Sequence, residues 1–292
     1  MPKVGVHVSI AGSIDRAVDR AIALGCDTFQ IFTRNPRGWR RRRLGKGEAR
    51  EFSRKLGASG IGPAVGHMPY LPNLASPKGA VYAKSVRALG TELTTCRRLG
   101  IPYLVTHLGS HLGAGADEGL RRVTAAINSA LSEGSDGVML LLENGAGSKN
   151  GIGSTFEEIA RIIDGVDAKE RVGVCLDTCH AFAAGYDLRD EASLGETIDE
   201  FERALGLWRL RIVHINDSKG GLGSGVDRHE HIGMGKIGNN GFRAILRHKA
   251  LSQLPMILET PLDGRRDDME ELRWVRRLAG KADPLEEGAE RD

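Results

Sequence analysis

Residues 138–143 read Val-Met-Leu-Leu-Leu-Glu, and residues 172–177 read Val-Gly-Val-Cys-Leu-Asp. Both segments are short, almost continuously apolar runs that end on a carboxylate. Strands of a parallel sheet have this composition because both faces of such a sheet are covered. The two segments therefore predict buried parallel strands, with Glu143 and Asp177 at or just past their C-terminal ends.

Six further runs of β-branched and apolar residues complete a regular series along the chain. The eight predicted strands start 24 to 45 residues apart, and each interval can hold a helix. Residues Ser13–Leu24 carry an apolar stripe with the 3.6-residue period of a helix. Ser76-Pro77 is typical of a cap followed by the first residue of a helix, here one that runs to Leu99. Ser154–Glu157 fits a capping box. The predicted strands are Val4–Val8, Thr28–Phe32, Ala64–Gly66, Tyr103–Thr106, Val138–Leu142, Val172–Leu176, Arg211–Ile215 and Met256–Leu258.

Eight successive strand–helix units predict a (β/α)8 TIM barrel, an α/β fold whose active site lies at the C-terminal ends of the strands. An open doubly wound sheet is the alternative. No Gly-x-Gly-x-x-Gly motif follows the first predicted strand, which weakens the dinucleotide-binding version of that fold. No linker divides the chain, so we expect one domain over residues 1–282. Residues 283–292 are expected to be a disordered acidic tail.

Composition and charge exclude several broad classes. The chain has 41 Lys and Arg against 38 Asp and Glu, a net charge of +3, so it is not a polybasic protein. Hydrophobic residues at 40% and charged residues at 27% are typical of globular proteins. There is no run of 18 apolar residues and no signal-peptide pattern at the start, so we expect no membrane span. Four cysteines are too few for a disulfide framework, and we expect a cytoplasmic protein.

Ionisable side chains gather where the predicted strands end, and in a barrel these ends meet on one face. A single histidine there is more often structural, but burying many histidines and carboxylates together is costly without a multivalent cation. Histidine and carboxylate ligands without a thiolate cluster suit Zn²⁺ or another divalent transition metal. Cys175 and Cys179 are predicted to be small core residues rather than ligands. The candidate ligands are His67, His107, Glu143, Asp177, His180, His214, Asp227, His229 and Glu259.

Nine candidate ligands are too many for one metal site. An open catalytic site uses three or four protein ligands, so nine ligands with one bridging carboxylate would serve about three metal ions. Two close metal ions activate a water molecule and contact both the attacking and the leaving oxygen. The ligand count therefore favours phosphoester chemistry.

Two loops on the same predicted face suggest contact with nucleic acid. The segment Arg34–Arg43 interleaves Trp39 with arginines, a pattern that suits phosphate contact and stacking, with a solvated charge run as an equal alternative. Tyr70 and Leu71 follow His67 by three and four residues and would form an exposed apolar pair. Such a pair either packs within its loop or acts as a wedge in a base stack.

Longer motifs run in order from Gly5 to about Pro261. They are GVHVSIAGS, FTRNPRGW, HMPYLPNLASP, THLGSH, LLENGAG, VGVCLDTCHAFAAGYDL, HINDSK, DRHEHIGMGKIG and ILETP. Together they resemble the endonuclease IV family of apurinic/apyrimidinic-site endonucleases. DTCHAFAAGYD and DRHxxIGxGxIG are long and highly specific, whereas THLGS or LETP alone would be weak.

The resemblance implies a TIM barrel with three Zn²⁺ ions per chain. It also implies cleavage of the phosphodiester 5′ to an abasic site, leaving a 3′-hydroxyl and a 5′-deoxyribose phosphate. By the same resemblance Glu143 and Glu259 are expected to be essential for catalysis. The implied ligand sets are His67, His107 and Glu143 for one zinc; Glu143 as a bridge with Asp177, His214 and Glu259 for the second; and His180, Asp227 and His229 for the third.

The resemblance also implies which residues enter the DNA at the lesion, and these match Arg37, Tyr70 and Leu71. Pro36 before that arginine and Glu230-His231 after the last ligand depart from the family pattern and concern the loops only. His7 and His231 match no family ligand and are expected to support the ligands or to pack. The implied partner is double-stranded DNA with abasic sites, and access of DNA to a barrel face favours a monomer.

Two other function classes remain to be separated from this one. A sugar isomerase or epimerase on a related barrel would also carry His, Glu and Asp at strand ends, but it needs only about four ligands and a small closed pocket. A non-catalytic DNA-lesion binder could keep the basic loops without needing all nine ligands. The extra ligands and the loops at Arg37 and Tyr70-Leu71 argue against the first class, and the complete ligand set argues against the second.

Overall fold

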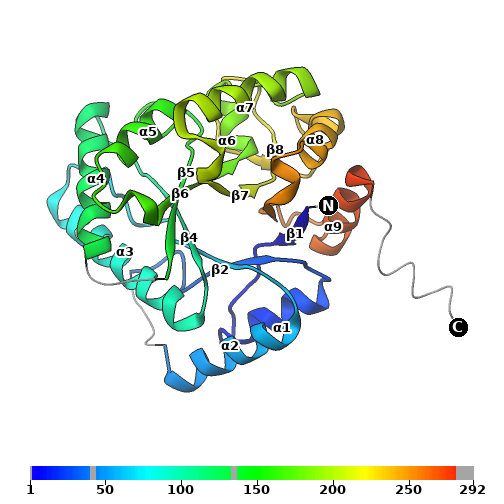
Figure 1. Ribbon diagram of the computed structural model, residues 1–292, viewed down its shortest axis with the longest axis horizontal. Helices are drawn as coiled ribbons and strands as arrows, with labels where there is room; N and C mark the ends of the chain where they lie inside the picture. The colour runs from blue at the N-terminus through cyan, green and yellow to red at the C-terminus, as the bar shows by residue number, and fades with distance from the viewer. Residues whose placement is uncertain (1, 40–43, 133–136, 281–292) are drawn as a thin grey trace, which may run out of the picture.

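The computed structural model describes residues 2–39, 44–132 and 137–280. Eight parallel strands form one sheet in the order β1-β10-β7-β6-β5-β4-β3-β2, curved into a barrel that helices surround (Figure 1). The predicted TIM barrel is confirmed, and each predicted strand overlaps an observed one. The strands are β1 (Lys3–Val6), β2 (Phe29–Phe32), β3 (Ala64–His67), β4 (Tyr103–His107), β5 (Met139–Glu143), β6 (Val172–Asp177), β7 (Leu210–His214) and β10 (Pro255–Leu258).

The two ends of this sheet, β1 and β2, lie side by side. A parallel bridge joins His7 to Gln30, and the backbone N of Val8 donates to the carbonyl of Gln30 at 2.8 Å. At the other end of the strands, the backbone N of Asp27 donates to the carbonyl of Val4 at 2.8 Å. The ring is therefore joined at the position where Gln30 and His7 enter the barrel.

A helix follows most strands and packs on the outside of the ring. After β6 two helices follow in succession, and a short antiparallel hairpin of β8 (Asp217–Ser218) and β9 (His229–Glu230) lies in the long connection after β7. The α-helices are α1 (Arg16–Ala23), α2 (Lys46–Ser59), α3 (Gly79–Leu99), α4 (Ala116–Ser132), α5 (Phe156–Asp164), α6 (Thr178–Ala184), α7 (Glu191–Leu205), α8 (Gly238–Arg247) and α9 (Asp268–Ala279). Single turns of 3₁₀-helix precede three strands: η1 (Lys169–Arg171), η2 (Leu207–Arg209) and η3 (Leu251–Gln253).

Two predicted helix starts are wrong by one or two residues. The hydroxyl of Ser76 accepts from the backbone N of Lys78 at 3.2 Å, a local turn, and α3 begins only after it, at Gly79. The cap of α5 is Thr155 rather than Ser154, and its hydroxyl accepts from the N of Glu158. The carboxylate of Glu158 in turn accepts from the backbone N of Gly153 and Ser154, so Ser154 belongs to the turn before α5.

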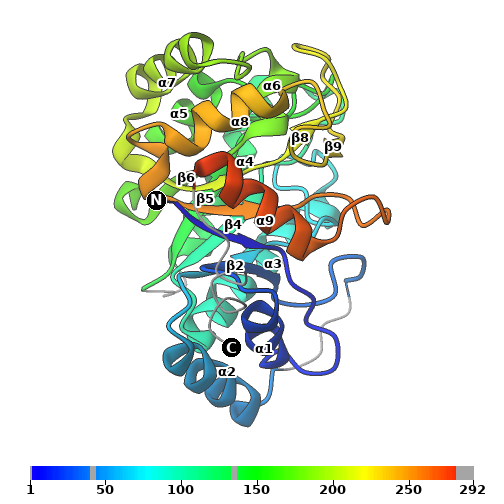
Figure 2. The same ribbon diagram turned by 90° about the vertical axis from the view of Figure 1, so that its right-hand side faces the viewer.

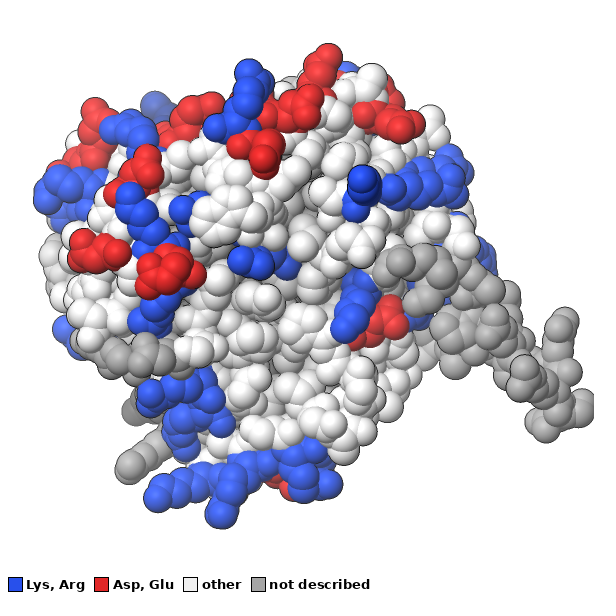
Figure 3. Space-filling view, viewed as in Figure 1, with Lys and Arg blue, Asp and Glu red and all other residues white. Residues whose placement is uncertain are grey.

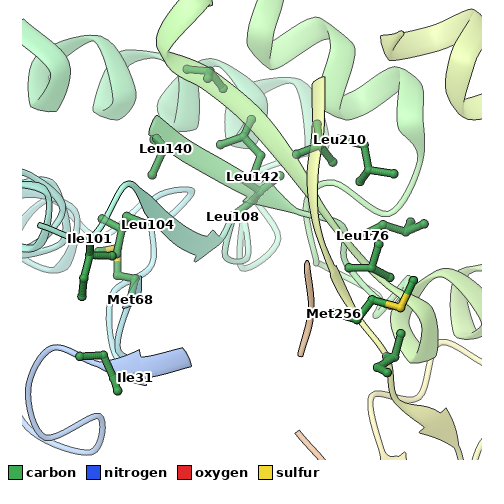
Figure 4. Packing of buried hydrophobic residues seen from close by; sticks show 14 of the residues in the cluster. Ile31, Met68, Ile101, Leu104, Leu108, Leu140, Leu142, Leu176, Leu210 and Met256 are labelled. Carbon is green, nitrogen blue, oxygen red and sulfur yellow. The ribbon is translucent and has the colours of Figure 1, made fainter. Parts of the chain in front are cut away.

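The apolar core has two layers on either side of the strands. Leu140 and Leu142 of β5 face the helices in the larger layer, and Figure 4 shows side chains of β4, β5, β6 and β7 in it. Leu141 faces inward, and so does Cys175, as predicted for a small core residue. This alternation is the two-residue period of a strand with both faces buried. The inner layer fills the barrel with Val65, Val105, Leu141, Cys175, Ile212 and Ile257.

The N-terminus and the β8–β9 hairpin lie at opposite ends of the barrel (Figure 2). Figure 2 shows the β8–β9 hairpin on the side opposite the N-terminus, where the strands end. Figure 3 looks onto the end at which the N-terminus lies; both signs of charge mix along its upper margin, and Lys and Arg predominate along its lower margin. No helix in the described ranges is long and apolar enough to cross a membrane. Residues 283–292 lie outside the described residues.

Candidate metal centre

All nine candidate ligands lie together at the C-terminal end of the barrel. His67, His107, Glu143, Asp177 and His214 are each the last residue of their strand, and Glu259 follows β10 directly. His180 is the third residue of α6, Asp227 lies in the connection between β8 and β9, and His229 is the first residue of β9. Their potential ligand atoms form several overlapping groups within which all atoms lie within 4.8 Å of one another, among them His67–His214–Glu259 and Asp177–Cys179–His229. Three of these groups together contain all nine residues, and they are His67–His107–Glu143, Glu143–Asp177–His214–Glu259 and His180–Asp227–His229.

Glu143 lies at the centre of the first two groups. Its Oε2 is 3.2 Å from His67 Nε2 and 3.3 Å from His107 Nδ1. Its Oε1 is 3.0 Å from His214 Nδ1. The two oxygens of one carboxylate thus face different histidines, which is the geometry that a bridging ligand requires.

Asp177 and Glu259 complete the second group around His214. Glu259 Oε2 lies 3.3 Å and Asp177 Oδ2 lies 3.9 Å from His214 Nδ1. Asp177 also caps α6, because its Oδ1 accepts from the backbone N of His180 at 2.8 Å. Asp177, a member of the second group, therefore also positions His180 of the third group.

The third group is the most open of the three. His180 Nε2 is 3.1 Å and His229 Nε2 is 3.6 Å from Asp227 Oδ1. Asp227 is exposed, whereas His180 is buried. Since Asp227 and His229 both come from the β8–β9 hairpin, this group depends on the conformation of that hairpin more than the others do.

Three of the five candidate histidine ligands are oriented as metal ligands typically are. His67 Nδ1 donates to the carbonyl of Met68 at 2.7 Å, His180 Nδ1 to that of Asn144 at 3.1 Å, and His229 Nδ1 to that of Glu259 at 3.0 Å. A metal-bound histidine typically donates its other ring N–H in this way. Because Nδ1 is occupied in each ring, Nε2 is the nitrogen that faces the carboxylates, and that of His229 is buried without a hydrogen-bond partner. The donor set fits divalent cations of the zinc type.

Charge in the centre shifts several pKa values. Burial alone would raise the pKa of Glu143 and Glu259, but the surrounding histidines, above all His107 for Glu143 and His214 for Glu259, hold both well below the usual range. Burial would lower the pKa of His180, but Asp177, Asp227 and Glu143 raise it to about 10. Glu143 and Glu259 are therefore ionised at neutral pH, and His180 must lose a proton before it can bind a cation.

Two asparagines that the sequence analysis missed hold these carboxylates in place. Asn144 accepts from the backbone N of Asp177 at 2.7 Å and donates to its carbonyl at 3.1 Å. Asn216 donates from Nδ2 to Asp177 Oδ2 at 2.7 Å and accepts at Oδ1 from the backbone N of Glu259 at 2.8 Å. Both lie within two residues of the end of a strand, and this is the position by which the candidate ligands were identified in the sequence.

The two extra histidines occupy different places. His7 Nδ1 lies 3.2 Å from Glu259 Oε1, directly beside the second group. His231 is buried between Glu271, with Nδ1 to Oε1 at 2.5 Å, and Asp263, with Nε2 to Oδ1 at 2.9 Å. His231, the residue after β9, therefore ties that strand to the loop after β10 and to α9.

Tyr70 and Leu71 are exposed beside the metal centre. Relative exposure is 60% for Tyr70 and 40% for Leu71, so the pair does not pack within its loop. The Tyr70 ring lies 5.1 Å from that of Phe32 and 6.2 Å from that of His107, centroid to centroid. Tyr70 and Leu71 are therefore exposed at the edge of the ligand cluster, next to His107.

The arginines after β2 do not act alike. Arg37 is exposed, and its backbone N donates to Asn35 Oδ1 at 3.0 Å. Arg34 is buried, with Nε 2.9 Å from Glu92 Oε1 on α3, so it anchors the loop rather than meeting phosphates. The Trp39 ring lies 5.8 Å from Lys84 Nζ. Arg40 to Arg43 lie outside the described residues.

Comparison with known proteins finds extensive similarity. A family model described as a xylose isomerase-like TIM barrel matches residues 18–278. A protein named probable endonuclease 4 from Methanoculleus marisnigri is 61% identical, covering 96% of this chain and all of the relative. A protein of the same name from Methanosphaerula palustris is 57% identical, covering 96% of this chain and 99% of the relative.

Comparison with solved structures gives the same family. The crystal structure of endonuclease IV from Thermus thermophilus matches with a TM-score of 0.85 and 40% identity, covering 96% of this chain and 100% of the other. A D-tagatose 3-epimerase-like protein matches with a TM-score of 0.73 over 99% of this chain and 98% of its own, but at 19% identity it shares the fold alone. The chain belongs to the endonuclease IV family of nucleases.

Proposed function

We propose that this protein cleaves the phosphodiester 5′ to apurinic/apyrimidinic sites in double-stranded DNA with three bound Zn²⁺ ions. The products would be a 3′-hydroxyl and a 5′-deoxyribose phosphate. The observation that carries the proposal is the set of three ligand groups in one site, two of which share Glu143.

The proposed ligands are the members of those three groups, with Glu143 as the bridge between the first two. Divalent ions held there would ease the ionisation of a water molecule and stabilise negative charge on the phosphate. The protein's own part is to hold ionised carboxylates and correctly oriented imidazoles around one phosphodiester. Glu143 and Glu259 are ionised at neutral pH, which supports an essential role for both.

Arg37, Tyr70 and Leu71 are proposed to recognise the lesion. An abasic nucleotide stacks poorly, so extruding it costs less than extruding an intact one. An exposed aromatic–aliphatic pair can enter the stack at that point, and a guanidinium can occupy the space of the missing base. Because Tyr70 lies beside Phe32 and His107, a backbone opened by this pair would be next to the metal centre.

The other function classes are less well supported. The sugar epimerases that share the fold are under 20% identical, whereas relatives named probable endonuclease 4 are 45–61% identical. A binding protein without catalysis would have no use for nine ligand side chains in three compact groups. We therefore place nuclease activity ahead of both.

The test is incubation with a duplex that carries one tetrahydrofuran abasic analogue, with and without a zinc chelator. We expect a single cut on the 5′ side of the analogue, giving a 3′ end that a DNA polymerase extends without processing. Glu259→Gln should abolish the cut, whereas Glu196→Gln on the exposed face of α7 is the matched control. Cleavage on the 3′ side, or an undamaged duplex cut equally well, would contradict the proposal.

A further inference from the structure

Gln30 is a buried amide side chain at the centre of the barrel. It is fully buried and lies within β2, two residues before the end of that strand. Its neighbours in the barrel are a histidine and a carboxylate of the second ligand group, together with His7. Nothing in the function proposed above uses this residue.

The two ends of the amide make different hydrogen bonds. Nε2 donates to Glu259 Oε1 at 2.7 Å and lies 3.1 Å from His7 Nδ1. Oε1 lies 2.9 Å from His214 Nε2, and as an amide oxygen it can only accept, so the imidazole must donate. Gln30 therefore favours the His214 tautomer that carries its proton on Nε2.

This tautomer leaves the other nitrogen of His214 free to bind a cation. His214 Nδ1 then faces Glu143 Oε1 at 3.0 Å and Glu259 Oε2 at 3.3 Å. The same amide occupies Glu259 Oε1, so Oε2 is the oxygen that remains for the centre. Gln30 thus leaves one metal-binding atom free on each of two ligands, and these two atoms, His214 Nδ1 and Glu259 Oε2, lie 3.3 Å apart.

We infer that Gln30 is a positioning residue of the metal centre, which presents His214 Nδ1 and Glu259 Oε2 to one cation. The inference rests on the proposed function, because that function supplies the cation. Side chains that orient metal ligands in this way typically change metal affinity about 10–100-fold when they are replaced. An ordinary packing role would change stability without touching the tautomer of His214.

The test compares Gln30→Met, which keeps the length but neither hydrogen bond, with the wild-type protein. Zinc affinity is measured by competition with a chromophoric chelator, and long-range ¹H–¹⁵N correlation spectra report which nitrogen of His214 carries the proton. Gln253→Met on the surface is the matched control, since Gln253 is the only other glutamine. Melting of the metal-free proteins checks the fold, and Gln30→Ala replaces the methionine variant if the latter does not fold.

We expect zinc-loaded wild type to show a protonated Nε2 and a metal-bound Nδ1 on His214. Gln30→Met should bind one zinc at least about tenfold more weakly and lose the slowly exchanging Nε2 proton. Wild-type affinity in Gln30→Met, or a metal-bound Nε2 in the wild type, would overturn the inference and leave the proposed function intact. Failure of the wild type itself to bind zinc would overturn both.

Discussion

Replacing Glu143 by glutamine removes one negative charge and one bridging oxygen from the centre. Glu143 belongs to two of the three ligand groups and not to the third, so the change should act on two metal ions out of three. Its oxygens lie 3.0–3.3 Å from His214, His67 and His107, which makes it the most connected ligand. We expect Glu143→Gln to retain one tightly bound zinc and to lose strand cleavage.

The magnitude follows from the number of ligands. A four-ligand structural zinc site is worth roughly 10–16 kcal/mol at neutral pH, so one ligand carries on average about 3 kcal/mol. A loss of about 3 kcal/mol is roughly a hundredfold in affinity. Two sites should therefore weaken about a hundredfold each, while the site of His180, Asp227 and His229 keeps its affinity.

The assay is zinc content by plasma emission spectrometry after dialysis against chelators of graded strength. Wild type should retain three zinc ions where Glu143→Gln retains one and Asp227→Asn retains two, and Glu196→Gln should behave as wild type. Metal-free melting curves show whether a variant has lost its fold instead. Three zinc ions retained by Glu143→Gln under conditions that strip Asp227→Asn would refute the bridging role.

Four further outcomes are expected. Replacing Tyr70 and Leu71 together by Ala should weaken binding to an abasic duplex, measured by fluorescence anisotropy, by about 1–3 kcal/mol per stacking contact. Binding to intact duplex should change little and zinc content not at all, and equal losses on both duplexes would contradict insertion of this pair into the base stack. Arg37→Ala should cause the same selective loss, whereas a uniform loss with a salt slope reduced by about one would mean simple phosphate contact. Glu92→Gln leaves the buried Arg34 guanidinium of the same loop without its carboxylate partner, and it should lower the free energy of unfolding by about 3–5 kcal/mol in denaturant titrations. An unchanged denaturation midpoint would argue against a stabilising role of the Arg34–Glu92 pair. Because the pKa of His180 is raised to about 10, the imidazole of the metal-free protein is protonated at pH 7, and zinc affinity should rise with pH up to about 10. Calorimetry in two buffers of different ionisation enthalpy should detect protons released on zinc binding. The absence of proton release at pH 7 would contradict this prediction.

The fold and the position of the nine candidate ligands follow from local patterns. Buried parallel strands have a recognisable composition, and the barrel brings their C-terminal ends to one face. Glu143, Asp177 and His214 could therefore be expected near one another although 34 or more residues separate them along the chain. Helix starts were less predictable, because polar side chains near them accept hydrogen bonds from backbone N–H groups outside the helix, as Ser76 does from Lys78 and Glu158 does from Gly153.

Partners that come from distant segments could not be predicted in the same way. Arg34 stands in a run of arginines that indicates a solvated or DNA-binding surface, yet it pairs with Glu92, 58 residues further on. No periodicity links the two positions, since only the packing of the β2 loop against α3 brings them together. Within the described residues, Arg37 and Trp39 are therefore the exposed members of this loop that are left for the proposed contact with DNA.

The amides around the centre were missed for a chemical reason. Gln30 and Asn216 carry no charge and bind no metal in the usual sense, so they stand out neither in a search for ligands nor in a search for charge. Yet the centre already holds four carboxylates, and a fifth beside Glu259 would add repulsion where an amide adds a donor. An amide also donates and accepts at once, so Gln30 can hold Glu259 with one end and His214 with the other. A site crowded with ionised groups is thus best aligned by neutral ones, and these are the residues that a sequence pattern of ligands does not reveal.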